Sequence, residues 1–315
     1  MYRRRPTGAP ARIGIADIEG VERTVRELRV LDYQYGGGSC HRAVLTRLPM
    51  ARALLAATVP VRLTRRVDTA VADMHNLAGW TLFDNGSITE ALHHFTIALD
   101  LATRAGDKAM AANIRYRIGR VHLHYNSPGH ALTEFERGRI EAHASNSLLA
   151  AAILSANQAW AFAKLGRAEE AIAALAMMRN EFEASDRSDV PSWAAFFTET
   201  ELSAMSGSVH TDLARFVDVR YAKRAVPELA TAIGSYGDGM ARSRAFCLIS
   251  LAVNQLLLHD VDAAVDIGRD ALVHGRSVKS SRLRDRLRPL ENEARKWCGA
   301  DELTEEIRTM LPAAS

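Results

Sequence analysis

The sequence predicts an all-α chain, a superhelix built of stacked helix pairs and closed by a C-terminal capping helix. Three observations support this prediction. One spacing of small residues recurs along the chain, apolar residues follow the 3.6-residue period of a helix, and few stretches alternate with the two-residue period of a strand. The 315 residues are 48% hydrophobic but only 6% aromatic, which suits closely packed helices better than sheets.

The recurring spacing is clearest in GWTLFDNGSITEALHHFTIAL, which begins at Gly79. A small residue in a first helix is followed, after a turn, by an alanine twelve positions later, here Ala91. The next copies place Ala131 and Ala171 at intervals of 40 residues, and a fourth copy places Ala264 in the same pattern. We therefore expect clear repeats near residues 70–105, 110–145, 150–185 and 240–275.

Each repeat is expected to contain two helices joined by a tight turn. The small residue of the first helix, Gly79 or Gly119 in the first two copies, lets two helix backbones approach closely. In the second helix, the alanine and the residues four and seven positions later share one face. One pair cannot bury its own apolar face, so neighbouring pairs must stack against it.

The order of Gly79, Gly86, Ala91, Phe95 and Ala98 resembles the tetratricopeptide repeat (TPR). The 40-residue unit exceeds the usual ~34 residues, and is similar to the longer-helix version found in sensor domains of bacterial transcription activators. The resemblance implies a right-handed superhelix (solenoid) that binds its partners on an extended concave surface. It says little about function, because this repeat is a scaffold for many partners.

A second resemblance runs from about Ile15 to Cys298. Five segments are similar to the C-terminal repeat region of actinomycete regulators whose N-terminal domain is a phage-repressor-type helix-turn-helix: VRELRVLDYQYGGGSCHRAVL, DMHNLAGWTLFD, YRIGRVHLHYNSPGHAL, ANQAWAFAKLGR and MARSRAFCLISLA. Such a DNA-reading domain needs roughly 60 residues, whereas only YRRRPTGAPARIG precedes the first expected helix. We expect either a freestanding relative or a gene fragment cut at the linker, with DNA contacted only through a missing or separate helix-turn-helix domain.

The N-terminal elements follow from local signals. We expect a basic flexible tail over residues 1–13, and one repeat domain over residues 14–315. A degenerate repeat is expected near 17–57, where Asp17 caps the first helix and the glycines that begin at Gly36 end it. Pro60 then opens a long helix that leads into the clear repeats.

The C-terminal elements are less regular. A degenerate repeat is expected near 192–236, with a first helix in PSWAAFFTETELSAMSG and an extended middle around Thr211 to Val219. The capping segment is expected over 280–311, with a helix bent near Pro289. Trp193, Phe196 and Phe197 lie together in the irregular part, where they would form an apolar patch for a homodimer.

Charge and cysteine usage limit the classes of function. The formal net charge of +3 is small for this length, and the dense basic runs are Arg3-Arg4-Arg5 and RLRDRLRPL. Alternate residues of a helix do not share a face, so we interpret the second run as solvated surface and do not expect this chain alone to bind DNA. Three distant cysteines and the absence of a signal peptide or long apolar span indicate a cytoplasmic protein with no membrane contact.

Catalytic and metal-binding signatures are absent from the sequence. Histidines crowd into two repeats, but neighbours such as His122 and His124 diverge on a helix and no HExxH occurs, so we expect a structural or surface role. The glycines before Ser39 lack the Lys-Ser/Thr ending of a phosphate loop, and no GxGxxG occurs. We expect a non-catalytic chain that uses no metal and no cofactor.

The family geometry places the first helix of each pair along the groove. The inward positions that this implies are Asp73, Asn76, Trp80 and Asp84 in one unit, Asn113, Tyr116, Arg117, Arg120 and His124 in the next, and Asn157, Trp160 and Lys164 in the third. Such side chains hydrogen-bond a peptide backbone or carboxylate while the aromatic rings supply apolar contact. The alternative is that Trp80 and Trp160 belong to the core, and that Arg117 and Arg120 pair with carboxylates between repeats.

Two functions stay open on this basis. The chain is either a sensor that binds a peptide, small effector or protein partner in its groove and regulates transcription, or a freestanding protein-protein interaction scaffold with no DNA role.

Overall fold

The computed structural model describes residues 12–276 and 278–311, and these contain 14 α-helices, three 3-10 helices and no strand. Arg3, Arg4 and Arg5 of the expected tail lie outside the described residues, while Ile13, at the end of that tail, is buried. The α-helices are α1 (Ile15–Tyr35), α2 (Gly37–Ala56), α3 (Val61–Asp84), α4 (Ile88–Ala105), α5 (Lys108–His124), α6 (Pro128–Ala144), α7 (Leu148–Lys164), α8 (Ala168–Glu183), α9 (Glu199–Phe216), α10 (Ala222–Ser235), α11 (Ala241–Leu257), α12 (Val261–Arg276), α13 (Ser281–Ala294) and α14 (Asp301–Met310).

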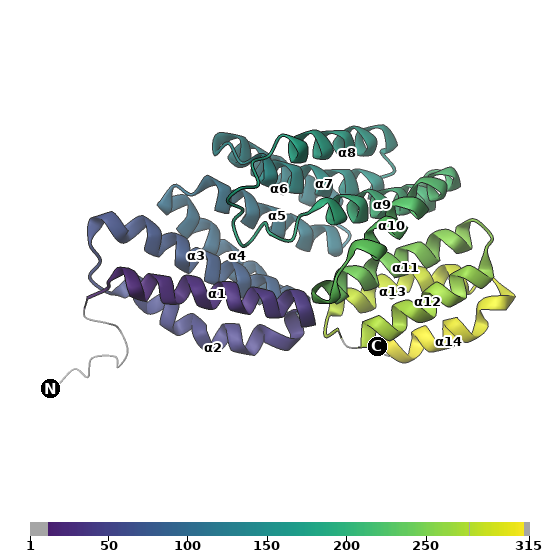
Figure 1. Ribbon diagram of the computed structural model, residues 1–315, viewed down its shortest axis with the longest axis horizontal. Helices are drawn as coiled ribbons and strands as arrows, with labels where there is room; N and C mark the ends of the chain where they lie inside the picture. The colour runs from purple at the N-terminus through teal and green to yellow at the C-terminus, as the bar shows by residue number, and fades with distance from the viewer. Residues whose placement is uncertain (1–11, 277, 312–315) are drawn as a thin grey trace.

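The helices stack in consecutive pairs along an arc, which Figure 1 shows running from α1 through α8 to α14. Each odd-numbered helix from α3 to α11 packs against the even-numbered helix that follows it. Contacts from α3 to α5, α5 to α7, α7 to α9 and α9 to α11 join the pairs. The predicted class, an all-α superhelix of stacked TPR-like pairs, is therefore confirmed.

The small residues of the repeat allow the two helices of a pair to pack closely. A Cβ atom added to Gly79 would lie 2.7 Å from the ring of Phe95, and one added to Gly119 would lie 2.3 Å from the ring of Phe135. Both phenylalanine rings are completely buried. The glycine and phenylalanine, sixteen positions apart, are therefore the two halves of one contact between a first and a second helix.

The turns inside the pairs also use residues suited to their backbone. Gly86 and Gly166 follow α3 and α7 with φ of 91° and 73°, and Asn126 follows α5 with φ of 54°. This left-handed region favours glycine and tolerates asparagine, and it is a common way to end a helix. The turn signals that the sequence displays are therefore required by the geometry.

Two expectations for the degenerate repeat were wrong. Residues 191–198 form turns rather than the start of a helix, and α9 continues through Thr211 to Phe216, where an extended stretch was expected. The start of α9 is favoured by two acidic residues in its first turn, Glu199 and Glu201, because a helix N-terminus attracts negative charge. Residues 191–198, which we call the turn segment, lie inside the arc, where Phe196 contributes to the wall of a cavity.

The expected aromatic patch is not on the surface. Trp193 and Phe197 are buried, and Phe196 packs against the core. These rings therefore pack the turn segment against the core instead of forming an exposed apolar patch. One smaller correction concerns a helix end. Asp17 lies inside α1 instead of before it, and it accepts a hydrogen bond from the amide of Gly14. The expected capping helix is α13, and Pro289 lies within it.

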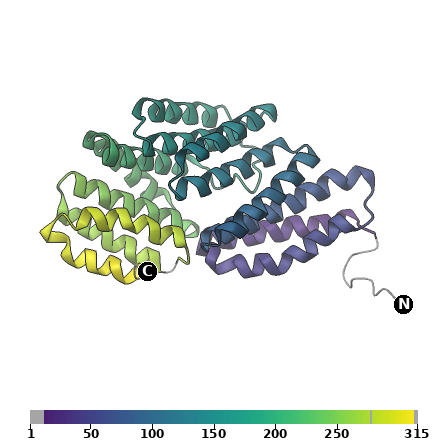
Figure 2. The same cartoon turned by 180° about the vertical axis from the view of Figure 1, so that it is seen from behind.

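The two ends of the arc touch, as the reverse view in Figure 2 also shows. The amide of Gly38, at the start of α2, donates to the carbonyl of Lys279, and the amide of Lys279 donates to the carbonyl of Tyr35. A Cβ atom on Gly38 would lie 2.6 Å from that lysine carbonyl oxygen. The glycines from Gly36 to Gly38 therefore let the N-terminal helices contact the short segment around Lys279 that precedes α13.

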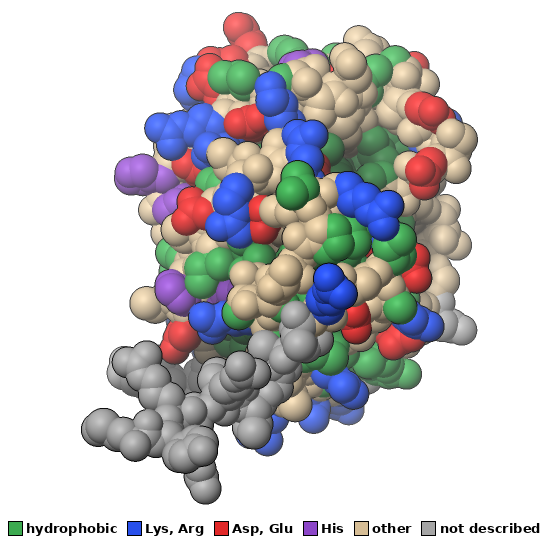
Figure 3. All heavy atoms as spheres, turned by 90° about the vertical axis from the view of Figure 1, so that its left-hand side faces the viewer, with side chains coloured by type: hydrophobic (Ala, Val, Ile, Leu, Met, Phe, Trp, Pro, Cys, Tyr) green, Lys and Arg blue, Asp and Glu red, His purple; other side chains and the backbone are tan. Residues whose placement is uncertain are grey.

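Two further features bear on the classes of partner. Over the end of the molecule formed by the first helices, Lys and Arg side chains are interspersed with Asp and Glu (Figure 3). The face seen in Figure 3 therefore lacks the continuous basic surface that binding to a nucleic-acid backbone requires. In the described ranges, no helix combines the length and apolar character needed to cross a membrane.

Candidate ligand-binding groove inside the arc

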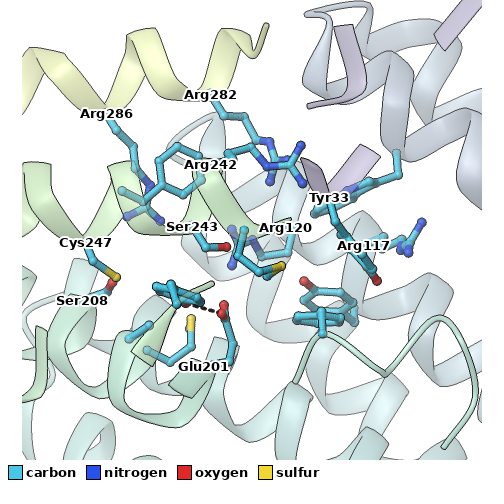
Figure 4. Close-up of a pocket in the computed structure, with 18 residues that line it drawn as sticks. Tyr33, Arg117, Arg120, Glu201, Ser208, Arg242, Ser243, Cys247, Arg282 and Arg286 are labelled. Atoms are coloured by element: carbon cyan, nitrogen blue, oxygen red, sulfur yellow. Dashed lines mark hydrogen bonds between the residues drawn. The ribbon is translucent and has the colours of Figure 1, made fainter. Parts of the chain in front are cut away.

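A cavity with about 760 Å³ of empty space, partly open to solvent, lies between α1–α8 and α9–α14, which we call the two arms of the arc (Figure 4). Side chains reach it from α1, α3, α5, α9, α11 and α13, from the connection between α10 and α11, and from the turn segment 191–198. The residues that line it are Tyr33, Trp80, Tyr116, Arg117, Arg120, Phe196, Glu201, Ala204, Met205, Ser208, Tyr236, Met240, Arg242, Ser243, Phe246, Cys247, Arg282 and Arg286. Odd-numbered helices therefore supply most of its wall.

A second cavity, with about 710 Å³ of empty space, adjoins the first. Ser208 and Arg286 line both cavities, so the two form one groove. The remaining walls of the second cavity are Leu123, His124, Trp160, Lys164, Thr211, Asp212, Arg215, Ile249, Ser250, Val253, Asp285 and Pro289. We call the two cavities together the groove.

Two of the arginines in the groove are neutralised by buried carboxylates. Arg242 lies 2.8 Å from Asp84 and 3.3 Å from Asp32, and Arg282 donates from its Nε to Asp84 at 2.6 Å. Burial by itself would raise the pKa of Asp84, but Arg282, Arg242 and the hydroxyl of Ser280 outweigh burial and hold that pKa well below its usual range. These contacts connect α1, α3, α11 and α13 at the point where the arms meet.

Three other arginines lack a carboxylate partner. Within the described residues, Arg117, Arg120 and Arg286 make no ion pair. Arg117 is 3% exposed and donates to the carbonyl of Asn76, and Arg120 donates to Asn157 Oδ1 at 3.1 Å. Burial lowers the pKa of all three guanidinium groups, and for Arg117, which also lies near the cation of Arg29, the pKa falls to about 10. The groove therefore holds an excess of positive charge.

The indole of Trp160 is a platform for the cations. Arg120 and Arg286 each lie 4.7 Å from the centre of this ring, and Lys164 lies 5.6 Å from it. The indole Nε1 donates to Asp212 at 2.7 Å, which holds the ring in place. Cation–π contact offsets part of the cost of burying these charges.

One carboxylate, Glu201, lies across the first cavity from Arg282 and Arg286 (Figure 4). The hydroxyl of Tyr236 donates to it at 2.5 Å. Burial raises the pKa of Glu201 more than its tyrosine and arginine neighbours lower it. One carboxylate stands against the five arginines that line the first cavity, so Glu201 leaves most of their positive charge uncancelled.

The opposite part of the first cavity is aromatic. The rings of Tyr116 and Phe196 stack with centroids 6.2 Å apart, and Tyr33 lies 6.3 Å from Phe196. The hydroxyl of Tyr33 is buried without a hydrogen-bond partner in the described chain. The groove thus combines one apolar wall with one cationic wall, which is the general composition of ligand sites.

Seven of the twelve residues predicted for the groove line it. Trp80, Tyr116, Arg117 and Arg120 line the first cavity, and His124, Trp160 and Lys164 line the second. Whether any of them binds a ligand stays a prediction. Trp80 and Trp160 are also mostly buried, so these rings belong to the packing of the helices as well as to the groove wall.

The other five predicted residues do not line either cavity. Asp73 is paired with Arg29, and Asn76 donates to Asn113 Oδ1 at 2.9 Å. Asn157 donates to the carbonyl of Ile153 and accepts from Arg120. Asp84, which the same geometry implied, is completely buried among arginines. These short polar side chains are consumed by contacts between neighbouring helices, which is why they fail to reach the groove.

Sequence reasoning missed the contribution of α13. The run RLRDRLRPL was expected to be solvated, but Arg282 and Arg286 face the groove while Arg284 and Arg288 are exposed. The spacing of four between Arg282 and Arg286 places them on one helix face, and that signal was available in the sequence. Nothing local indicated that α13 would lie against α3 and α11.

The clustered histidines lie away from the groove, apart from His124. His75 Nδ1 lies 3.0 Å from His94 Nδ1, and burial together with the nearby cations lowers the pKa of His75 to about 3. In the part of the chain that the structure describes, no three His, Cys, Asp or Glu side chains are placed to hold a metal ion.

Comparison with known proteins identifies the fold alone. No family model matches the chain, and no curated protein matches it. Among solved structures, the apo form of RapI matches with a TM-score of 0.54 and 13% sequence identity, over 84% of this chain and 85% of that one. The two proteins therefore share a helical-repeat architecture over most of their lengths.

Proposed function

We propose that this chain is a non-catalytic binding and sensing module. It takes up a peptide, a small effector or a segment of a partner protein in the groove, and through this binding it regulates transcription. The observation that carries the proposal is the groove itself, where arginines without carboxylate partners face stacked aromatic rings. An apolar pocket with a few convergent polar groups is the usual form of a binding site.

Regulation requires that binding alter the arrangement of the arms. The groove is lined by helices from both ends of the arc, so a ligand there contacts the two arms at once. A ligand that binds one arrangement better than another shifts the population toward it. We infer that the output is read by a separate helix-turn-helix domain in the cytoplasm, as in the actinomycete regulators that the sequence resembles.

A thermal-shift screen against peptide and small-molecule fractions of the producing cells tests the proposal. Ser208 lies on α9 where the two cavities join, so Ser208→Trp should fill the junction. A ligand at a hundred times its dissociation constant stabilises by about 2.7 kcal/mol. We expect at least one fraction to raise the melting temperature of the wild type and to have no effect on Ser208→Trp.

Ser203→Trp is the matched control, because Ser203 lies on the same helix and lines neither cavity. It should respond like the wild type. The alternative function, a freestanding interaction scaffold with no DNA role, is favoured if no fraction shifts the wild type but a protein partner binds outside the groove.

A further inference from the structure

We propose that the ligand of the groove is an anion with an apolar body. Its acidic group, a phosphate or a carboxylate, lies among Arg120, Arg282 and Arg286, which we call the arginine cluster, and its apolar part lies against Tyr116 and Phe196. This inference rests on the proposed function and specifies the chemistry that the groove selects. It is carried by charge balance, by unpaired donors and by the rigidity of the arginine side chains.

The charge balance comes first. Five arginines and one glutamate line the first cavity. Asp32 and Asp84 oppose the charges of Arg242 and Arg282, but in the described residues no carboxylate lies within ion-pair distance of Arg120 or Arg286. A buried cation without a counter-charge is costly. An anionic ligand would supply the missing charge.

Unpaired donors point to the same place. Arg282 is 5% exposed, and its Nη2 has no hydrogen-bond partner in the described chain, although its Nε is bonded to Asp84. Arg117 lines the same cavity, and its Nε is likewise unpartnered. Buried donors normally find an acceptor, so these two atoms leave hydrogen-bonding capacity unused on arginines that line the cavity.

The arginine cluster is held in position before any ligand arrives. The guanidinium of Arg286 lies between two rings, 4.7 Å from Trp160 and 4.6 Å from Phe246. Arg120 is fixed by the same indole and by Asn157. Arg282 and Arg286 are one turn apart on α13 and share a face. Fixed planar forks suit the oxygen atoms of phosphate and carboxylate, and less entropy is lost on binding.

The apolar body follows from the remaining wall. Tyr116 and Phe196 stack beside the cavity, and Tyr33 lies 6.3 Å from Phe196 on the same side. A small inorganic ion would leave these surfaces in water. A group with an aromatic or aliphatic portion would bury them, at about 25 cal/mol for each Å² of apolar surface removed from water.

Three probes separate charge from shape. Phenyl phosphate and 3-phenylpropionate carry the two acidic groups on the same ring, and 3-phenylpropionamide is the uncharged analogue. We expect one or both acids to raise the melting temperature of the full chain, with the amide giving no shift. The acid that binds more tightly identifies phosphate or carboxylate as the natural group.

Two variants test the location. Arg120→Met and Arg286→Met keep the apolar stem that packs against the rings but remove the charge. Each should weaken binding of the acid about tenfold or more, as loss of a charge-assisted hydrogen bond does. Without ligand, both variants should melt at or above the temperature of the wild type, because an uncompensated cation has been removed. A purely structural arginine would show the opposite change.

Arg137→Met is the control, since Arg137 is 60% exposed on α6 and paired with Glu134. It should bind the probes like the wild type. Equal shifts with the amide, acid binding that survives in both cluster variants, or the absence of a shift with either acid would overturn the proposal. If a cell fraction still shifts Arg120→Met and Arg286→Met fully but not Ser208→Trp, the groove binds a ligand that is not anionic, and only the further inference fails.

Discussion

Oδ1 of Asp84 on α3 accepts a 2.6 Å hydrogen bond from Nε of Arg282 on α13, across 198 positions of sequence. The same carboxylate also accepts from Arg242, from Ser280 and from the amide of Gly37. A side chain with no exposed surface is thus the point where the first and last parts of the arc are joined. Asp84 thus joins helices that form the wall of the groove without lining the groove itself.

Replacing this carboxylate should separate the arms. Asp84→Asn leaves Arg242 and Arg282 buried with less counter-charge, and breaking a buried ion pair costs about 3–5 kcal/mol. We expect a loss in that range in chemical denaturation, and a larger radius of gyration in small-angle X-ray scattering. Asp218→Asn is the control, because Asp218 pairs with the exposed Arg220 and such surface pairs contribute little. Equal stability of Asp84→Asn and wild type would show that the ends are joined by other contacts.

The pH dependence of this contact has a definite sign. The folded-state pKa of Asp84 is held below its unfolded value of about 3.9. A depressed carboxyl pKa contributes stability that is present above the unfolded pKa and is lost as the pH falls toward the folded one. The junction should therefore stabilise the protein fully at neutral pH and weaken below about pH 4.

The helix-pair contact gives a second prediction. Gly119→Ala places a methyl group against the ring of Phe135, which has no room to move because it is completely buried. Overpacking of this kind costs about 1–3 kcal/mol. Gly129→Ala, in the neighbouring helix α6, meets no atom within 4 Å and should leave stability equal or slightly higher. Equal melting temperatures for the two variants would refute the packing of α5 against α6 described above.

The buried histidine gives a third prediction. Burial, followed by His94, Arg52 and His93, lowers the pKa of His75 to about 3. The unfolded chain binds this proton near pH 6.5, so the stability that neutral His75 provides is lost as the pH falls from about 6.5 toward 3. The slope attributable to one such group is at most about 1.4 kcal/mol per pH unit.

His75→Gln should remove that slope. We expect the free energy of unfolding of His75→Gln to fall less steeply than that of wild type between pH 6.5 and pH 4. His143→Gln, whose side chain is 50% exposed, should retain the slope of the wild type. Parallel curves for His75→Gln and wild type would mean that His75 is protonated in the folded protein.

The repeat register could be predicted because it depends on local rules. The small residue at Gly79 or Gly119 and the phenylalanine sixteen positions later are required wherever two helices pack this closely, and the turn glycines are required by a left-handed backbone. The turn segment 191–198 could not be predicted in the same way. Its apolar residues resemble a buried helix, and only the tertiary structure decides that Phe196 lines the groove.

The groove was predicted in part. Arg117 and Arg120 belong to a clear repeat, and the resemblance to the tetratricopeptide repeat implies their inward direction. Arg242, Arg282 and Glu201 reach the groove only because the arc closes on itself. The closure depends on contacts between residues separated by some two hundred positions, such as Asp84 and Arg282, and a helical period carries no information about these contacts.

The central claim is that a ligand binds in the groove between the two arms. Hydrogen–deuterium exchange, with and without a cell fraction that raises the melting temperature, tests this claim most directly because it locates the ligand on the fold. The account predicts simultaneous protection in α5, α9, α11 and α13, which line the groove from both arms, and no protection in Ser208→Trp. Protection confined to the outer helices α4, α6 and α8, or to one arm alone, would contradict it.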